Sequence, residues 1–382
     1  MDTSQTIPET AGRDSVEPCH FSRLISWPAA IGFRSDRSQA AGLRATLRTL
    51  AFCLSLLAFT GCRTSSPVAL ERYEYTQPEM GVPFRIVLYA ANREEADAAA
   101  KAAFDRIAAL NAVLSDYEYD SELSTLSRTA SSGQVVHVSD DLWRVLARAQ
   151  DVAQRSGGAF DVTVGPIVSL WRKARRDQAL PEPPRLSRAL ASTGWQKLQL
   201  DPHAHTARLL VPGMRLDLGG IAKGYAMDEA LKVLEEHGIA RALVSGGGDM
   251  AVSDPPPAKP GWRIEIAPLD VPDAPPARFV LLRRTGLATS GDLFQHVEID
   301  GVRYSHIVDP HTGIGLTDHS LVTVIARDGM TADSLSTAIS VLGPDRGLAL
   351  ADQERAAVCI VRKPAATIEV RDNPRLKRWL EK

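Results

Sequence analysis

The stretch Leu216-Asp217-Leu218-Gly219-Gly220-Ile221-Ala222-Lys223-Gly224-Tyr225-Ala226 carries the most information about the fold. Its pattern predicts a strand end, a glycine turn and the first turn of a helix. Because Gly219 and Gly220 lack a Cβ, a ligand can approach their backbone closely, and the helix start beyond them offers N–H groups to an anion. Lys223 adds a full positive charge. The stretch therefore indicates a phosphate site, although an ordinary βα turn shows the same pattern.

A second cluster follows downstream, where residues 304–313 (Tyr-Ser-His-Ile-Val-Asp-Pro-His-Thr-Gly) precede residues 331–337 (Thr-Ala-Asp-Ser-Leu-Ser-Thr). Asp333 and Thr337 are four residues apart, so a helix would place both oxygens on one face. A carboxylate and a hydroxyl together suit Mg²⁺, which takes few protein ligands. The alternative is structural: Thr331 caps the helix and Asp333 favours its positive end.

Five further blocks accompany these clusters, at 80–84, 115–124, 158–166, 245–249 and 288–292. In this order the blocks resemble the ApbE family, the FAD:protein FMN transferases, over roughly residues 70 to 375. The resemblance implies an α+β fold, with one catalytic domain of mixed sheets and helices that is T-fold-like and built of two packed lobes. The scatter of short strands among helices independently favours α+β architecture.

The resemblance also implies the function and its residues. The family transfers FMN from FAD to a threonine, or serine, hydroxyl of a target flavoprotein and releases AMP. The Gly220 carbonyl with Asp333 and Thr337 would hold Mg²⁺, and His306 would be the general base, with His296 and His311 as rivals. An imidazole of ordinary pKa, near 6.5, can accept such a proton at pH 7. The positions that match FAD contacts are Met80, Tyr117, Ala159, Phe160, Asp161, Asp217, Lys223 and Ile307.

Two other functions remain open on the sequence. The same site would split FAD into FMN and AMP if water replaced the hydroxyl, which would make the protein an FAD pyrophosphatase. A non-catalytic flavin-binding lipoprotein is the third reading, against which the intact His306, Asp333 and Thr337 argue. The net charge of −2 offers no basic face to nucleic acid, and the four cysteines lack metal-like spacing.

The N-terminal residues of the sequence predict that the protein is exported. Residues 50–61 form an apolar run of signal-peptide length behind two arginines, too short to span a bilayer comfortably. Phe59-Thr60-Gly61-Cys62 resembles a bacterial lipobox, so we expect Cys62 to be lipidated; plain secretion after cleavage is the alternative. The chain then divides into 1–42 (disordered or an over-extended gene start), 43–62 (signal), 63–72 (tether) and 73–382 (transferase domain). The protein would be lipid-anchored in the bacterial cell envelope and face the periplasm.

Periodicity and caps predict the elements of the folded part. Helices are expected from Asn92 to about Leu114, from Ser139 to Ser156, and at 221–237, 332–342 and 345–352. Strands are expected at 84–89, 207–211, 241–245, 262–267, 278–283, 320–326 and 356–362. The charged and proline-rich residues 174–187 are expected to form a surface excursion.

Overall fold

The computed structural model describes residues 69–271, 276–293, 295–364 and 367–381. Pro67–Lys382 cluster as one compact unit. The residues predicted to form the signal peptide and the lipobox, Cys62 included, lie outside the described residues. Among the helices that the structure describes, none combines the length and the apolar character needed to cross a membrane.

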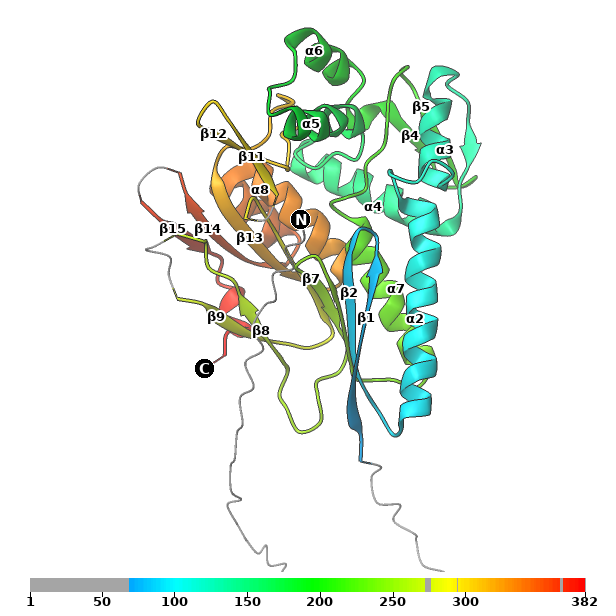
Figure 1. The fold of residues 1–382 in the computed structure, drawn as a ribbon, viewed down its shortest axis with the longest axis vertical. Helices are drawn as coiled ribbons and strands as arrows, with labels where there is room; N and C mark the ends of the chain where they lie inside the picture. Colours follow the sequence, from blue (N-terminus) through cyan, green and yellow to red (C-terminus); the bar gives the residue numbers. More distant parts are fainter. Residues whose placement is uncertain (1–68, 272–275, 294, 365–366, 382) are drawn as a thin grey trace, which may run out of the picture. The chain divides into compact units, whose positions relative to one another are not determined.

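An eight-stranded sheet in which every neighbouring pair is antiparallel forms the centre of the fold (Figure 1). Its spatial order is β1 (Glu71–Glu79), β2 (Val82–Ala90), β6 (Ala242–Gly246), β7 (Asp249–Val252), β10 (Thr285–Gly291), β13 (His319–Ala326), β14 (Ala357–Lys363) and β15 (Glu369–Asp372). Side chains alternate between the two faces, as the pleat requires. On β2, Phe84, Ile86 and Leu88 enter the larger core, whereas Val87 enters the core of the opposite face.

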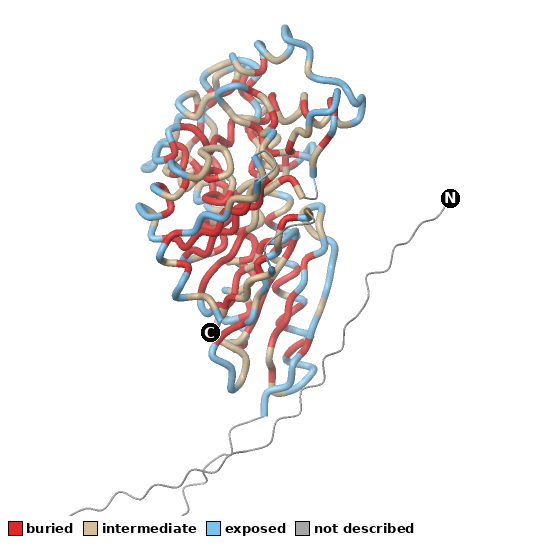
Figure 2. Tube along the Cα trace, turned by 90° about the vertical axis from the view of Figure 1, so that its left-hand side faces the viewer, coloured by how far each residue is buried: buried red, intermediate tan, exposed pale blue. Residues whose placement is uncertain are grey.

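Three long helices cover one face of the sheet: α2 (Arg93–Leu114), α7 (Ala222–Glu236) and α8 (Gly329–Gln353). The other face packs against the hairpin of β8 (Trp262–Ile266) and β9 (Arg278–Leu282), together with the short turn Leu376–Arg378. Figure 2 shows that the buried segments follow the strands and the inner sides of these helices. The sheet is therefore buried on both faces, and its helices are held in fixed relative positions.

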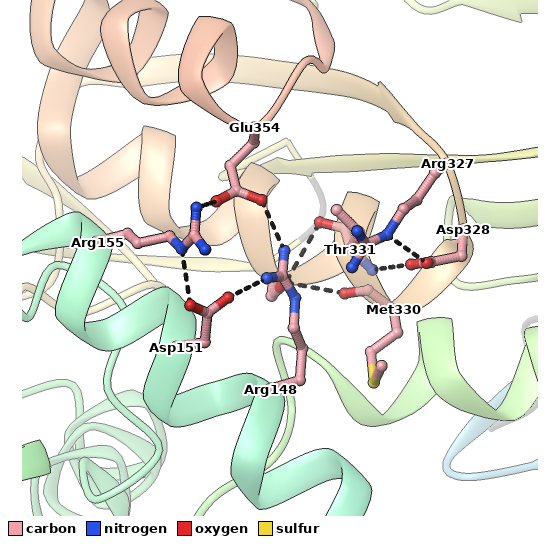
Figure 3. A network of polar contacts seen from close by, with 9 residues as sticks. Arg148, Asp151, Arg155, Arg327, Asp328, Met330, Thr331 and Glu354 are labelled. Carbon is pink, nitrogen blue, oxygen red and sulfur yellow. Dashed lines mark hydrogen bonds and ion pairs between the residues drawn. The ribbon is translucent and has the colours of Figure 1, made fainter.

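A smaller region lies at one end of the sheet (Figure 1). It contains α3 (Glu122–Arg128), α4 (Asp140–Ser156), α5 (Gly165–Asp177), α6 (Pro183–Ala191), the sheet of β3 (Val136–His137), β5 (Thr206–Leu209) and β4 (Leu198–Asp201), and the hairpin of β11 (His296–Ile299) and β12 (Val302–Ser305). Arg148 of α4 and Glu354, which follows α8, form an ion pair that ties this region to the sheet-covering helices (Figure 3).

The α+β class and the main elements predicted from the sequence are confirmed. Asn92 caps α2 by accepting from the Glu95 N–H at 3.0 Å, and Ser139 caps α4. Residues 174–187 lie mostly at the surface, as expected, and much of the segment is helical, in α5 and α6. The helices expected at 332–342 and 345–352 are confirmed as the two parts of α8, which is kinked between them, where Gly343 has a φ of 72° and Pro344 lacks an N–H. One expectation is wrong, that of a strand end directly before the glycine turn. No strand precedes the glycine turn, where only Arg215 pairs, in an isolated bridge with Val164.

Candidate active site

The glycine turn brings α7 against α8. Asp217 shapes the turn, because its Oδ1 accepts from the Gly219 N–H at 2.8 Å. A Cβ added to Gly220 would lie 2.8 Å from Oγ1 of Thr337 and 3.3 Å from Cε2 of Phe160. Glycine at 220 therefore lets its backbone approach the hydroxyl of Thr337 on α8.

The first turns of α7 and α8 are in backbone contact. A Cβ on Gly224 would lie 2.2 Å from the carbonyl oxygen of Gly329. Asp228, one turn further along α7, accepts from the N–H groups of Gly329 (2.7 Å) and Met330 (2.8 Å). Burial raises the pKa of Asp228 to about 7, while these two hydrogen bonds oppose the shift. Asp228 therefore binds the positive end of α8 to α7.

The N-cap of α8 differs from the expectation. Asp328 is the N-cap, because its Oδ1 accepts from the Thr331 N–H at 2.7 Å. Oγ1 of Thr331 is buried and has no hydrogen-bond partner among the described residues. The predicted capping role of Thr331 is therefore wrong.

A buried charged cluster lies where the two helices meet. Oδ2 of Asp333 accepts from the Gly224 N–H at 3.0 Å and lies 3.6 Å from Nζ of Lys223. Lys223 also pairs with Asp249, at the start of β7, at 3.1 Å. Burial raises the pKa of Asp333 to about 7, against the opposing charge of Lys223. Burial alone would lower the pKa of Lys223, but the charges of Asp333 and Asp249 outweigh it and raise that pKa above its ordinary value.

The donor set fits a hard divalent cation. Both recorded polar contacts of the Asp333 side chain go to Oδ2, so within the described residues Oδ1 remains for a further ligand. The hydroxyl of Thr337, one turn further along α8, lies against the backbone of Gly220. Within the same residues no three His, Cys, Asp or Glu side chains cluster as metal ligands. A cation here would therefore have one carboxylate ligand, with the remaining oxygens neutral, as Mg²⁺ tolerates when phosphate completes its shell.

His306 is arranged as a neutral base. Its Nδ1 lies 3.1 Å from the carbonyl oxygen of Gln295, which also accepts from the His306 backbone N–H at 3.0 Å. A carbonyl only accepts, so the neutral ring carries its proton on Nδ1 and leaves Nε2 as the acceptor. Burial lowers the pKa of His306 to about 4, and the charges of Arg175 and Lys223 add to the shift. The ordinary pKa expected from the sequence is therefore wrong.

The two rival histidines have other surroundings. Nδ1 of His296 is hydrogen-bonded to the Asp292 carbonyl oxygen at 2.9 Å. The ring of His311 lies beside Gly158, where an added Cβ would be 3.2 Å from its Cε1.

The residues matched to FAD contacts lie on several segments around this cluster. Phe160 packs beside Gly220, and the Val162 carbonyl accepts from the Asp217 N–H at 2.8 Å, so the segments of 159–163 and 217–220 are joined. Oδ1 of Asp161 accepts from both the N–H and the hydroxyl of Thr163 at 2.7 Å, and burial raises the pKa of Asp161. Oδ1 of Asp161 therefore already serves as an acceptor within its own turn.

Two of the matched residues have unusual backbone environments. Met80, in the β1–β2 turn, has a φ of 48°, a conformation that is costly for a residue with a side chain and that often marks a functional position. Ile307 was expected to offer its backbone. Its N–H donates to Oγ of Ser305 and its carbonyl accepts from the Leu316 N–H, so only a second lone pair on that carbonyl remains.

Arg172 belongs to no sequence motif and was not predicted as a site residue. This arginine of α5 bonds to Asp116 at 2.5 Å and to Asp217 at 2.9 Å, and its Cζ lies 4.2 Å from the centre of the Tyr117 ring. Burial raises the pKa of Asp217, the charge of Asp116 adds to the shift, and Arg172 opposes it. Arg172 thus connects two of the matched positions.

The site combines potential ligands for a divalent cation at the starts of two helices with a glycine turn and a neutral histidine. This combination is typical of enzymes that act on phosphate compounds. The chain belongs to the ApbE family, whose sequence profile matches residues 80–361. Proteins named FAD:protein FMN transferase from Haemophilus influenzae and Vibrio cholerae are 34% and 33% identical to it. The matches cover 66% and 81% of this chain and 75% and 92% of those proteins.

Solved structures agree with the sequence comparisons. The flavin transferase ApbE from Vibrio cholerae has a TM-score of 0.73 and 30% identity, with 82% of this chain and 100% of that chain covered. The flavinyl transferase ApbE of Pseudomonas stutzeri, in its apo form, gives a TM-score of 0.71 and 28% identity, with 82% and 98% covered.

Proposed function

We propose that the protein is an FAD:protein FMN transferase, the activity that names its curated relatives. FAD is its substrate, and a flavoprotein subunit with a threonine, or serine, hydroxyl is the acceptor. The observation that carries the proposal is one cluster. The Asp333 carboxylate, the Thr337 hydroxyl and the Gly220 backbone meet beside Lys223, whose charge also acts on His306.

The transfer follows from the chemistry of these groups. Nε2 of His306 accepts the proton of the acceptor hydroxyl while its oxygen forms a bond to the FMN phosphorus. The phosphorus–oxygen bond to AMP breaks, and AMP leaves with that electron pair. Lys223 offers positive charge to the pyrophosphate. Mg²⁺ held by the Gly220 carbonyl, Asp333 and Thr337 would stabilise the negative charge that develops on the leaving group.

The test separates transfer from its alternatives. The purified protein is incubated with FAD, Mg²⁺ and a candidate flavoprotein subunit; AMP and the mass of the subunit are then measured. Transfer gives one covalent FMN on the subunit for each AMP released. Equal amounts of free FMN and AMP, with every tested subunit unmodified, would instead indicate a pyrophosphatase. Flavin binding without AMP would indicate a non-catalytic flavin protein.

The anchoring of the protein is a second part of the proposal. The apolar run at 50–61 followed by Cys62 supports a lipoprotein signal, cleaved before a lipidated Cys62. Residues 63–72 would tether the transferase domain to the membrane of the bacterial cell envelope, facing the periplasm. Acceptor subunits would then be met at the membrane surface.

A further inference from the structure

Arg172 joins three groups that come from two other segments of the chain. Its guanidinium bonds to Oδ2 of Asp116, in the loop after α2, and to Oδ2 of Asp217, before the glycine turn. The ring of Tyr117 lies against its face, 4.2 Å from Cζ to the ring centre. A planar guanidinium can donate in its plane and stack on its face at the same time, which an ammonium cannot do.

The two carboxylates need this cation. The side chains of Asp116 and Asp217 are each only 9% exposed, so water screens their mutual repulsion poorly. Arg215 donates to the Asp116 carbonyl at 2.8 Å, and its charge favours the ionised form of Asp217, but it forms no ion pair with either carboxylate among the described residues. Without Arg172, the two carboxylates would separate or take up a proton.

Tyr117 is unusual because one face of its ring is held by a neighbouring side chain while the other face is exposed to solvent. One face lies against Arg172, yet the residue is 75% exposed. An exposed tyrosine normally samples several rotamers, and the guanidinium reduces that freedom. The second face is therefore a flat aromatic surface that another ring can stack on.

We propose that Arg172 is a positioning residue for FAD. It holds the Tyr117 ring so that its open face stacks with one aromatic ring of FAD, and it holds the Asp217 carboxylate so that it accepts from a hydroxyl of the same molecule. The inference rests on the proposed function and on the family resemblance, which matches Tyr117 and Asp217 to FAD contacts.

The same loop provides a matched control. Cζ of Arg128 lies 4.2 Å from the ring centre of Tyr119, which is 72% exposed. Arg128 otherwise donates to the Tyr119 carbonyl and to Oγ1 of Thr125, and it contacts no carboxylate among the described residues. Arg128→Gln therefore removes an equivalent stacking contact without changing Asp217.

The experiment compares Arg172→Gln, Arg172→Lys and Arg128→Gln in the full chain. Flavin fluorescence gives the dissociation constant for FAD, and FMN transfer gives kcat and KM. Arg172→Gln should raise the dissociation constant and KM by about 10- to 100-fold, the worth of a charged hydrogen bond with a stacking contact, while kcat stays within about threefold. Arg172→Lys should be intermediate, because it keeps the charge but not the stacking. Arg128→Gln should match the wild type.

Several results would overturn the inference. These results are an FAD affinity that is unchanged in both Arg172 variants, one that is equally weakened in Arg128→Gln, and one that is unchanged while kcat falls. If Arg172→Gln does not fold, Arg172→Lys combined with Tyr117→Leu decides: additive losses in affinity would show that Arg172 does not act through Tyr117. A wild type that binds FAD but transfers no FMN refutes the proposed function alone, and one that does not bind FAD refutes both.

Discussion

His306 combines a fixed tautomer with a low proton affinity, and the two properties predict different measurements. His306→Ala removes only the proton acceptor, so FAD binding should be nearly unchanged while FMN transfer falls by about 10²- to 10⁴-fold. Binding is measured by flavin fluorescence and transfer by AMP release. His311→Ala serves as the comparison and should retain most of the activity; the reverse result would make His311 the base.

The pH dependence of the wild type gives a second test of His306. The base acts in its neutral form, and burial lowers its pKa to about 4, so the ring stays neutral until the pH falls close to that value. Asp333 has a pKa raised to about 7, so the comparison is made at saturating Mg²⁺, which favours the ionised carboxylate; under that condition the transfer rate at pH 5 should be close to the rate at pH 7. With an ordinary pKa near 6.5, the neutral fraction would fall about 25-fold over this interval. A loss of that size would show that the environment of His306 differs from the one described here.

Asp333 should control the affinity for Mg²⁺. Asp333→Asn keeps an oxygen that can accept from the Gly224 N–H but removes the negative charge, so the Mg²⁺ concentration for half-maximal transfer should rise at least about 10-fold. Excess Mg²⁺ or Mn²⁺ should rescue part of the activity. The Mg²⁺-dependent rise in melting temperature measures the same loss without turnover. Asp345→Asn, on an 86% exposed side chain of α8, is the control. Equal Mg²⁺ dependence of both variants would exclude Asp333 as a ligand.

Helices α7 and α8 are in backbone contact at Gly224 and Gly329, and this contact sets the geometry of the site. A Cβ in Gly224→Ala would lie 2.2 Å from the Gly329 carbonyl, which is backbone and cannot rotate away. The first turns of α7 and α8 would have to separate, at a cost of about 1–3 kcal/mol that outweighs the gain of about 1 kcal/mol in helix propensity. Denaturant unfolding should show this loss, and the Mg²⁺ requirement should rise because Asp333 moves from Gly220.

The control for this contact is Glu236→Ala, at the exposed end of α7. It should change neither the free energy of unfolding nor the Mg²⁺ requirement. A Gly224→Ala protein of unchanged stability would mean that the two helices adjust without cost.

Elements were predictable where their signals are local. The caps at Asn92 and Ser139 and the apolar faces behind them determine α2 and α4 within a few residues. The sequence of α6 contains comparable information, since Pro183 and Pro184 open the helix where a missing N–H costs nothing. Prolines beside charged residues resemble a loop when no packing partner is known, which explains why α5 and α6 were missed.

The assembly of the site belongs to the whole molecule and was only partly predictable. Helical spacing places Asp333 and Thr337 on one face, but packing of α7 and α8 over one sheet brings Gly220 to them. Arg172 has no motif, because Asp116, Tyr117 and Asp217 reach it only through the fold. The tautomer of His306 depends on the Gln295 carbonyl. Because every residue has a backbone carbonyl, the sequence does not reveal which one accepts from the ring.

Membrane attachment also concerns the whole molecule. Cys62→Ser in a bacterial host should release the protein from membranes, because the proposed acyl chains would be its anchor after signal cleavage. The transferase activity of the released protein should be unchanged. Fractionation and intact mass measure the two effects. Identical membrane partitioning of variant and parent, with no lipid mass on either, would contradict the lipoprotein proposal.

The stability of the whole unit should depend on one buried arginine more than on its exposed neighbour. Arg148 and Arg155 of α4 both pair with Asp151 and Glu354, but their side chains are 10% and 49% exposed (Figure 3). Glu354 is 7% exposed, so losing Arg148 leaves a poorly solvated carboxylate with only the outer arginine.

Arg148→Ala should therefore lower the free energy of unfolding by about 3 kcal/mol, the lower end of the cost of breaking a buried pair. Arg155→Ala should cost less than about 1 kcal/mol, as exposed pairs do. Urea denaturation of both variants measures the difference, and 1 M salt should reduce only the smaller effect. Arg148 connects α4 to the end of α8. Equal losses of unfolding free energy in the two variants would mean that the carboxylates of Asp151 and Glu354, and not the burial of Arg148, hold these helices together.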